Sequence, residues 1–237
     1  MCGISGVLGE SKRALVESMN NRLSHRGPDA EAVYSFQGGL LGHRRLSIMD
    51  PEGGNQPIFN EDSSSALVAN GEVYNFHALR KKLSSRHRFA TTSDSEAILH
   101  LFEESGWSTA RQIDGMFAFA IAEDDSLFLA RDPIGIKPLY YSIGEEDGRE
   151  KLYFASELKA LSGIAEDVRE FPPGTFYSTD AGFRTYYSVP EYPPRRMPVD
   201  LRIKVLRDTL IESVTKRLMS DVPLGAFLSG GIDSSSI

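Results

Sequence analysis

The sequence predicts an α+β fold in which helices cover both faces of a two-sheet sandwich. Short apolar runs separated by turn residues recur along the chain, a spacing typical of antiparallel or stacked sheets. Only a few stretches carry helical periodicity. A proline-rich stretch then favours an extended connector; its prolines are Pro190, Pro193, Pro194 and Pro198. We therefore expect one large domain at 1–187, a linker at 188–199 and the start of a second domain at 200–237.

Composition limits the classes of partner. Of the 237 residues, 41% are hydrophobic and 25% are charged, which is ordinary for a globular protein. The net charge is −7 and the sequence has no basic block, so nucleic acid and an anionic membrane are not expected partners. A single cysteine excludes an internal disulfide and a multi-cysteine metal site, and no metal site is predicted. The sequence has neither an apolar run of about 18 residues nor a signal pattern, so we expect a cytoplasmic protein.

The N-terminal part is expected to begin with a strand and a helix. Residues 3–8 mix small and apolar side chains, as in a buried strand, which would hold the preceding Cys2 still. Ser11 is the expected N-cap of the helix that follows. Two strand-like runs, 31–36 and 40–46, then form a hairpin.

The middle of the chain alternates strands and helices. A short apolar strand at 66–69 runs into Asn70, and a helix capped by Asn75 follows through about residue 83. Residues 87–91 are strand-like, and the Ser93-Asp94-Ser95-Glu96 stretch has the pattern of a capping box that opens another helix.

Further short strands complete the predicted large domain. Apolar runs occur at 116–122, 126–131, 138–143 and 151–156, with a turn at 145–148. A helical turn at 157–161 and a last hairpin, 174–178 with 183–187, follow them.

The segment at 200–237 begins with a helix and ends in a serine- and glycine-rich loop. Asp200 is the expected cap of an amphipathic helix through Met219, and 223–228 is expected to form a short buried strand. A strand that runs into a glycine-rich loop before a helix is typical of a phosphate cradle, which predicts that role for 229–235. The lysine of a Walker loop is absent, and a flexible tail is the alternative interpretation.

Cys2 is the strongest candidate nucleophile. Removal of Met1 would leave a thiol and a free α-amino group on one residue. The amine has a pKa of ~7.7 and the thiol one of ~8.5, so the amine can act as general base while the sulfur attacks. An unreactive, half-buried thiol at a frayed terminus is the alternative.

Asn70 and Gly71 are candidates for an oxyanion hole. An amide side chain followed by a backbone N–H supplies two donors to one point, as acyl transfer from a carboxamide requires. The alternative is a type I′ hairpin turn, for which Asn-Gly is a strong signal. For the other two candidates the alternatives are structural. Asp94 could only interact favourably with the dipole at the N-terminus of its helix, and Arg45 could be a solvated charge at a strand end.

Several ordered blocks resemble glutamine-dependent asparagine synthetases. The blocks are Met-Cys-Gly-Ile at 1–4, His-Arg-Gly-Pro-Asp at 25–29, Arg-Leu-Ser-Ile at 45–48, Asn-Gly-Glu-Val-Tyr-Asn at 70–75, Ser-Asp at 93–94, Gly-Met-Phe-Ala-Phe-Ala at 115–120, Arg-Asp at 131–132 and Ser-Gly-Gly-Ile-Asp-Ser-Ser at 229–235. The resemblance implies a four-layer α-β-β-α sandwich of the N-terminal-nucleophile hydrolase type. It also implies that the start of an α/β ATP-pyrophosphatase domain follows.

The resemblance further implies roles for individual residues. Cys2 would be the nucleophile, Asn70 and Gly71 the oxyanion hole, Arg45 the clamp on the glutamine α-carboxylate and Asp94 the acceptor for the α-ammonium. Other residues of the glutamine pocket would be Leu46, Ile48, Met49 and Glu72. In the second domain, Leu228 would contact the nucleotide, and its phosphates and metal would be held by Ser229, Gly230, Gly231, Asp233 and Ser234. The full-length enzyme would use ATP and Mg²⁺ with glutamine and aspartate, whereas glutamine hydrolysis would need no cofactor.

The chain departs from this family in stopping at Ile237. We therefore expect glutamine hydrolysis without ATP binding or asparagine synthesis, and faster amide exchange after about Val189. A fragment of a longer ligase and a shortened gene product both stay open, as do a homodimer and another acceptor carboxylate. A non-catalytic glutamine-binding module is the alternative from a different class.

Overall fold

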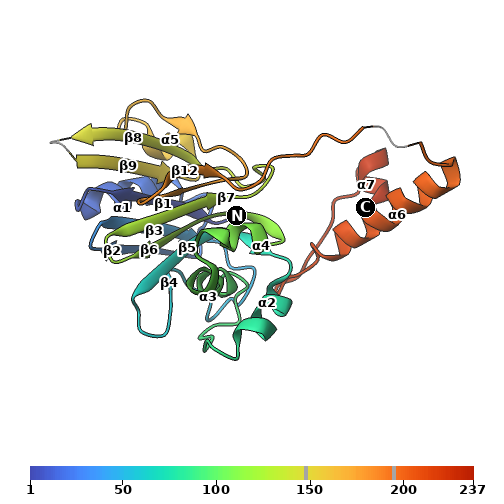
Figure 1. Cartoon of the computed structure of the whole chain (residues 1–237), viewed down its shortest axis with the longest axis horizontal. Helices are drawn as coiled ribbons and strands as arrows, with labels where there is room; N and C mark the ends of the chain where they lie inside the picture. The colour runs from blue at the N-terminus through green and yellow to red at the C-terminus, as the bar shows by residue number, and fades with distance from the viewer. Residues whose placement is uncertain (147–148, 194–195) are drawn as a thin grey trace. The chain divides into compact units, whose positions relative to one another are not determined.

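The computed structural model describes residues 1–146, 149–193 and 196–237 (Figure 1). Within these residues the chain divides into two compact units, Met1–Val189 and Pro190–Ile237. Part of the predicted turn at 145–148 and Pro194 of the predicted linker lie outside the described residues. No helix among the described residues is both long and apolar enough to cross a membrane.

The described residues of the first unit form two six-stranded antiparallel sheets. The strand order of the first sheet is β10 (Arg169–Glu170), β8 (Tyr140–Glu146), β9 (Arg149–Ala155), β1 (Gly3–Leu8), β3 (Gly39–Arg45) and β2 (Ala30–Phe36). The order of the second sheet is β12 (Gly182–Thr185), β11 (Thr175–Ser178), β7 (Ser126–Arg131), β6 (Gly115–Glu123), β5 (Ser65–Val73) and β4 (Ile58–Phe59). The strand that follows Cys2 is therefore held on both sides, by β3 and β9.

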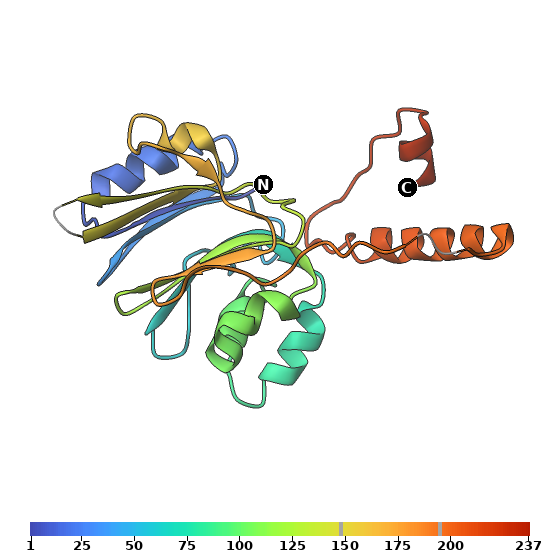
Figure 2. The same ribbon diagram turned by 45° about the horizontal axis from the view of Figure 1, so that its top comes forward.

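Helices cover the outer face of each sheet (Figure 2). The helices over the first sheet are α1 (Arg13–Arg22) and α5 (Leu158–Leu161). Over the second sheet lie α2 (Phe76–Leu83), α3 (Glu96–Ser105), the short 3₁₀ turn η1 (Gly106–Ser108) and α4 (Thr109–Gln112). The predicted α+β, four-layer α-β-β-α fold is thus confirmed.

The alternation of side chains along the strands builds these layers. Ile4 and Leu8 of β1 belong to the core between the sheets, together with Val68 of β5. Val7 points to the other face, where it packs with Val16 of α1. Because successive strand side chains point to opposite faces, one strand serves both layers.

Three predicted local features are wrong, because glutamate side chains bind the backbone instead. The N-cap of α1 is Lys12 rather than Ser11, and the Glu10 carboxylate accepts both of their N–H groups, at 3.0 and 2.9 Å. The capping box at 93–96 is absent, since α3 has Ser95 at its N-cap. Residues 87–91 form no strand. The Glu96 carboxylate instead accepts the N–H groups of residues 90 and 91, at 2.6 and 2.7 Å.

The described residues of the second unit form two helices, α6 (Val199–Thr215) and α7 (Ile232–Ser236). Pro198 rather than Asp200 is at the N-cap of α6, and the helix ends before Met219. The predicted buried strand at 223–228 is wrong, because these residues are exposed and irregular. A strand needs a hydrogen-bonded neighbour, and the described residues of this unit form no strand that could provide one.

Candidate functional site

Every residue predicted for the glutaminase site lines one cavity. These residues are Cys2, Asn70, Gly71, Arg45, Leu46, Ile48, Met49, Glu72 and Asp94. They come from the position just before β1, the end of β3 and the segment after it, the second half of β5, and the turn before α3. Residues far apart in the sequence therefore surround one thiol.

The thiol of Cys2 is held by the backbone of Leu46. The Leu46 N–H donates to Sγ at 3.4 Å, and the S–H donates to the Leu46 carbonyl at 3.6 Å. Burial raises the pKa of Cys2, against the opposing effects of the Leu46 hydrogen bond and the charges of the N-terminus, Arg45 and Lys137. At neutral pH the sulfur is therefore a thiol, and its attack requires a base.

Arg26 holds the main chain of Cys2. Its Nε donates to the Cys2 carbonyl at 2.9 Å, and its Nη1 pairs with Glu157 at 2.9 Å. The neighbouring Asp29 accepts the Ser47 N–H at 2.7 Å. The block at 25–29 thus holds the main chain at Cys2 and at Ser47, a role that only long-range contacts reveal.

Asn70 and Gly71 lie inside β5 rather than in a hairpin turn, since they pair with Ala118 and Phe117 of β6. A side chain at Gly71 would meet the Met116 carbonyl at 2.3 Å, so this position requires glycine. One orientation of the Asn70 side-chain amide satisfies both the Cys2 carbonyl and the Arg26 guanidinium. In it, Nδ2 donates to the Cys2 carbonyl at 3.1 Å and Oδ1 accepts from Arg26 at 3.3 Å. An amide nitrogen carries two hydrogens, so one donor stays available to a ligand in the cavity.

The terminal nitrogens of buried Arg45 are hydrogen-bonded to the protein itself. Nη1 donates to the Pro51 carbonyl at 3.0 Å and to Asn55 Oδ1 at 2.8 Å, while Nη2 donates to the carbonyls of Met49 and Asp50 at 3.2 and 2.5 Å. These bonds engage every hydrogen on the two terminal nitrogens. Arg45 shapes the loop in this conformation, and a carboxylate would use its Nε–H or require the loop to move.

Asp94 is a buried carboxylate in the turn that precedes α3. It is 3% exposed, and its Oδ2 accepts the Val73 N–H at 2.6 Å. Burial raises the pKa of Asp94 to about 6; the Val73 hydrogen bond opposes this and the charge of Glu72 adds to it. The Asp94 carboxylate is therefore ionised at pH 7, and a cation beside it would stabilise its buried charge.

Changing Asp94 to asparagine should weaken glutamine binding and also stabilise the free protein. The raised pKa means that stability from this group is present below pH about 4 and lost as the pH rises through about 6. The amide of the Asp94→Asn variant keeps an acceptor for Val73 and removes a buried charge, so the variant should gain on the order of 1 to 3 kcal/mol at pH 8.

The pH dependence of kcat/KM for glutamine checks the binding half of this prediction. The free Cys2 amine gives both chains an acid limb of kcat/KM. Below pH about 6 the parent should fall more steeply, because Asp94 also takes up a proton, and the Asp94→Asn variant should lack this second step. Unchanged KM together with an unchanged acid limb would contradict the assigned role.

Lys137 is a cavity residue that the sequence analysis missed. It is 4% exposed, and its Nζ lies 3.5 Å from Met1 Sδ. Burial lowers its pKa, while the charges of Glu72 and Cys2 act in the opposite direction. The Arg-Asp block at 131–132 holds the backbone of Lys137. Asp132 accepts the Lys137 N–H at 2.9 Å, and Arg131 donates to the Lys137 carbonyl at 2.7 Å. In the sequence, the charged pair Arg131-Asp132 before a turn is the feature that could have indicated a structured loop leading to Lys137.

Comparisons with known proteins identify the family of the chain. Residues 1–172 match the family model described as glutamine amidotransferase domain. The chain belongs to this family. Residues 205–237 match the model described as asparagine synthase, and the resemblance stated from the sequence is thereby confirmed.

Curated relatives match this chain over its whole length. The chain is 44% identical to a protein named asparagine synthetase [glutamine-hydrolyzing] 2 from Arabidopsis thaliana, with 100% of this chain and 42% of the relative covered. It is 42% identical to a protein of the same name from Oryza sativa subsp. japonica, with 100% and 41% covered. The chain thus spans about two fifths of the length of these relatives.

A solved structure shares the fold. It is the glutamine phosphoribosylpyrophosphate amidotransferase from B. subtilis complexed with ADP and GMP. The TM-score is 0.63 and the identity 25%, with 77% of this chain and 48% of that chain covered.

Proposed function

We propose that the first unit hydrolyses glutamine to glutamate and ammonia. Removal of Met1 frees the Cys2 amine, which takes the thiol proton. Sγ then bonds to the carboxamide carbon, the C–N bond breaks and ammonia leaves with that proton. Water attacks the resulting thioester, which releases glutamate and restores the thiol.

The observation that carries this proposal is the convergence in one cavity of a thiol, two oxyanion donors and a buried carboxylate. Asn70 Nδ2 and the Gly71 N–H would bind the developing oxyanion, while Asp94 would bind the α-ammonium. The α-carboxylate is assigned to Arg45. A non-catalytic glutamine-binding module is less favoured, because it needs neither the thiol nor the oxyanion donors.

The direct test measures both products and the site of covalent reaction. A chain shown by intact mass to begin at Cys2 should release glutamate and ammonia in equal amounts from glutamine. A glutamine-derived chloroketone should add once, at Cys2, and a Cys2→Ala chain should neither react nor turn over. A folded, correctly processed chain that releases no glutamate would overturn the proposal.

We further propose that the whole protein uses this ammonia to convert aspartate to asparagine in an ATP-dependent reaction. The names of the curated relatives and the match at 205–237 support this. Another acceptor carboxylate is the alternative. The boundaries 1–187, 188–199 and 200–237 belong to the same proposal, supported by the division of the chain after Val189.

The loop at 229–235 fits part of a nucleotide site. Ser229 and Ser234 hydroxyls lie 2.9 Å apart, and Gly230 has a φ of 78°, where glycine is favoured. We assign phosphate and Mg²⁺ contacts to Ser229, Gly230, Gly231, Asp233 and Ser234, and a nucleotide contact to Leu228. A homodimer and a cytoplasmic location stay predictions.

A further inference from the structure

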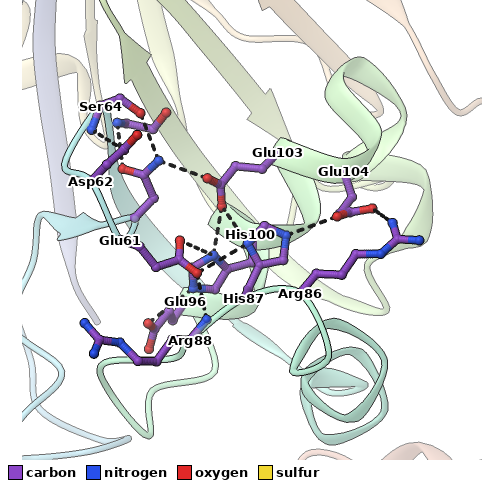
Figure 3. Close-up of polar contacts among 12 residues, drawn as sticks. Glu61, Asp62, Ser64, Arg86, His87, Arg88, Glu96, His100, Glu103 and Glu104 are labelled. Carbon is purple, nitrogen blue, oxygen red and sulfur yellow. Dashed lines mark hydrogen bonds and ion pairs between the residues drawn. The ribbon is translucent and has the colours of Figure 1, made fainter.

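Two histidines and two glutamates meet outside the glutamine cavity (Figure 3). Glu61 follows β4, His87 lies between α2 and α3, and His100 and Glu103 are on α3. His100 is fully buried. One potential ligand atom from each residue lies within 4.8 Å of all the others. Three separate segments of the chain therefore bring imidazole and carboxylate ligands to one point.

The spacing of the ligand atoms around His87 suits a bound cation. Glu103 Oε2 lies 2.8 Å from Nδ1 of His100 and 3.4 Å from Nδ1 of His87. The oxygens of Glu61 lie 3.6 and 3.8 Å from the Nδ1 atoms of His87 and His100, respectively. A tetrahedral Zn²⁺ with bonds of ~2.0 to 2.1 Å separates its ligands by about 3.3 to 3.4 Å. The distances around His87 exceed an ordinary hydrogen bond and match this separation instead.

Each of the four side chains is also oriented from outside the cluster. The outer contacts are His87 Nε2 to Glu104 at 3.2 Å, His100 Nε2 to Glu96 at 3.4 Å, Glu103 Oε1 to Asn60 Nδ2 at 2.9 Å and Glu61 Oε1 to the Arg88 N–H at 2.7 Å. A carboxylate on the outer nitrogen of a histidine fixes the tautomer with its lone pair on the inner nitrogen. Nδ1 of both histidines therefore carries a lone pair that a metal ion can accept.

The charge of the cluster favours a cation at this point. With neutral imidazoles, the two inner carboxylates carry a charge of about −2, which one divalent ion neutralises. The His87 ring stacks on His100 with centroids 4.7 Å apart. Nδ1 of each ring faces the same Glu103 oxygen, at 3.4 Å from His87 and 2.8 Å from His100.

We propose that Glu61, His87, His100 and Glu103 form a Zn²⁺ site. Two imidazoles with two carboxylates are a ligand set that Zn²⁺ accepts in tetrahedral geometry. The ion would tie the loop after β4 and the segment before α3 to α3 itself. It would thereby fix the segment that leads to Asp94, without taking part in glutamine hydrolysis.

Metal binding to the 237-residue chain tests this site. The experiment uses a Cys2→Ala background to remove the thiol as a ligand, and Co²⁺ and Zn²⁺ as probes after removal of bound metal with a chelator. We expect one Co²⁺ per chain with the intense visible absorption of a tetrahedral site, displaced by one Zn²⁺. Zn²⁺ should also raise the melting temperature, because it binds the folded state.

Two variants and a matched control locate the ion. His87→Ala and Glu103→Gln should each weaken Zn²⁺ binding at least about 10- to 100-fold and abolish the Co²⁺ spectrum. Glu103→Gln keeps the size of the side chain and an acceptor for Asn60, so it tests charge rather than folding. The exposed His77 of α2 lies outside the cluster, and His77→Ala should bind as the parent does.

The outcomes separate a built site from surface adsorption. No stoichiometric metal binding by the folded chain would overturn the proposal. Equal weakening in His77→Ala and Glu103→Gln would also overturn it, as would an octahedral Co²⁺ spectrum unaffected by both cluster variants.

Discussion

A chain that keeps one uncleavable residue ahead of Cys2 should hydrolyse glutamine about 10² to 10⁴-fold more slowly than the processed chain, because it lacks the general base. Burial raises the pKa of the Cys2 thiol, so the sulfur has to lose its proton during attack. The hydrogen bonds around Sγ come from the Leu46 backbone, whose carbonyl is too weak a base to accept that proton fully. The free α-amine of Cys2 would supply the general base that the Leu46 backbone cannot.

Intact mass and glutamate release measure this effect together. An added residue also fills part of the cavity, since Met1 itself lines it. Glutamine affinity is therefore compared between extended and processed chains that both carry Cys2→Ala. A large fall in turnover with affinity changed less than about threefold would isolate the base. Full activity of the extended chain would rule the mechanism out.

Much of the fold follows from local pattern. Residues 3–8, 31–36 and 40–46 carry the apolar and turn signals of strands, and they become β1, β2 and β3 with a central place for β1. Their side-chain alternation then assigns one face to the second sheet and the other to α1. Resemblance to a known family supplied the pocket residues, all of which line one cavity.

The remaining features depend on partners that are distant in sequence. Residues 87–91 have a strand-like composition, but their N–H groups bind elsewhere and no strand forms. The Glu96 carboxylate accepts those of residues 90 and 91, and Glu61 accepts that of Arg88. Lys137 reaches the cavity only because Arg131 and Asp132 shape the turn between them. The cluster around His100 likewise joins segments that no spacing rule relates, so it was not predicted.

Asn70→Ala should lower kcat about 10² to 10³-fold, the cost of removing one oxyanion donor, with a small change in KM. The carboxamide oxygen gains charge as Sγ attacks, so the amide donor interacts more strongly with the transition state than with bound glutamine. Gly71 would supply the second donor and leave residual turnover. Parallel measurement of kcat and KM on processed chains checks this split.

Asn70 also contacts the Cys2 carbonyl and Arg26, so its loss could act by displacing the thiol. The rate at which a small electrophile without an amide labels Cys2 separates the two effects, because labelling needs a placed thiol but no oxyanion hole. That rate should change less than about threefold in Asn70→Ala. Asn75→Ala is the matched control, since Asn75 bonds Gln112 and Asp114 away from the cavity and should keep the parent kcat. A loss expressed wholly in KM, or a labelling rate that falls in proportion to kcat, would make Asn70 a positioning residue rather than an oxyanion donor.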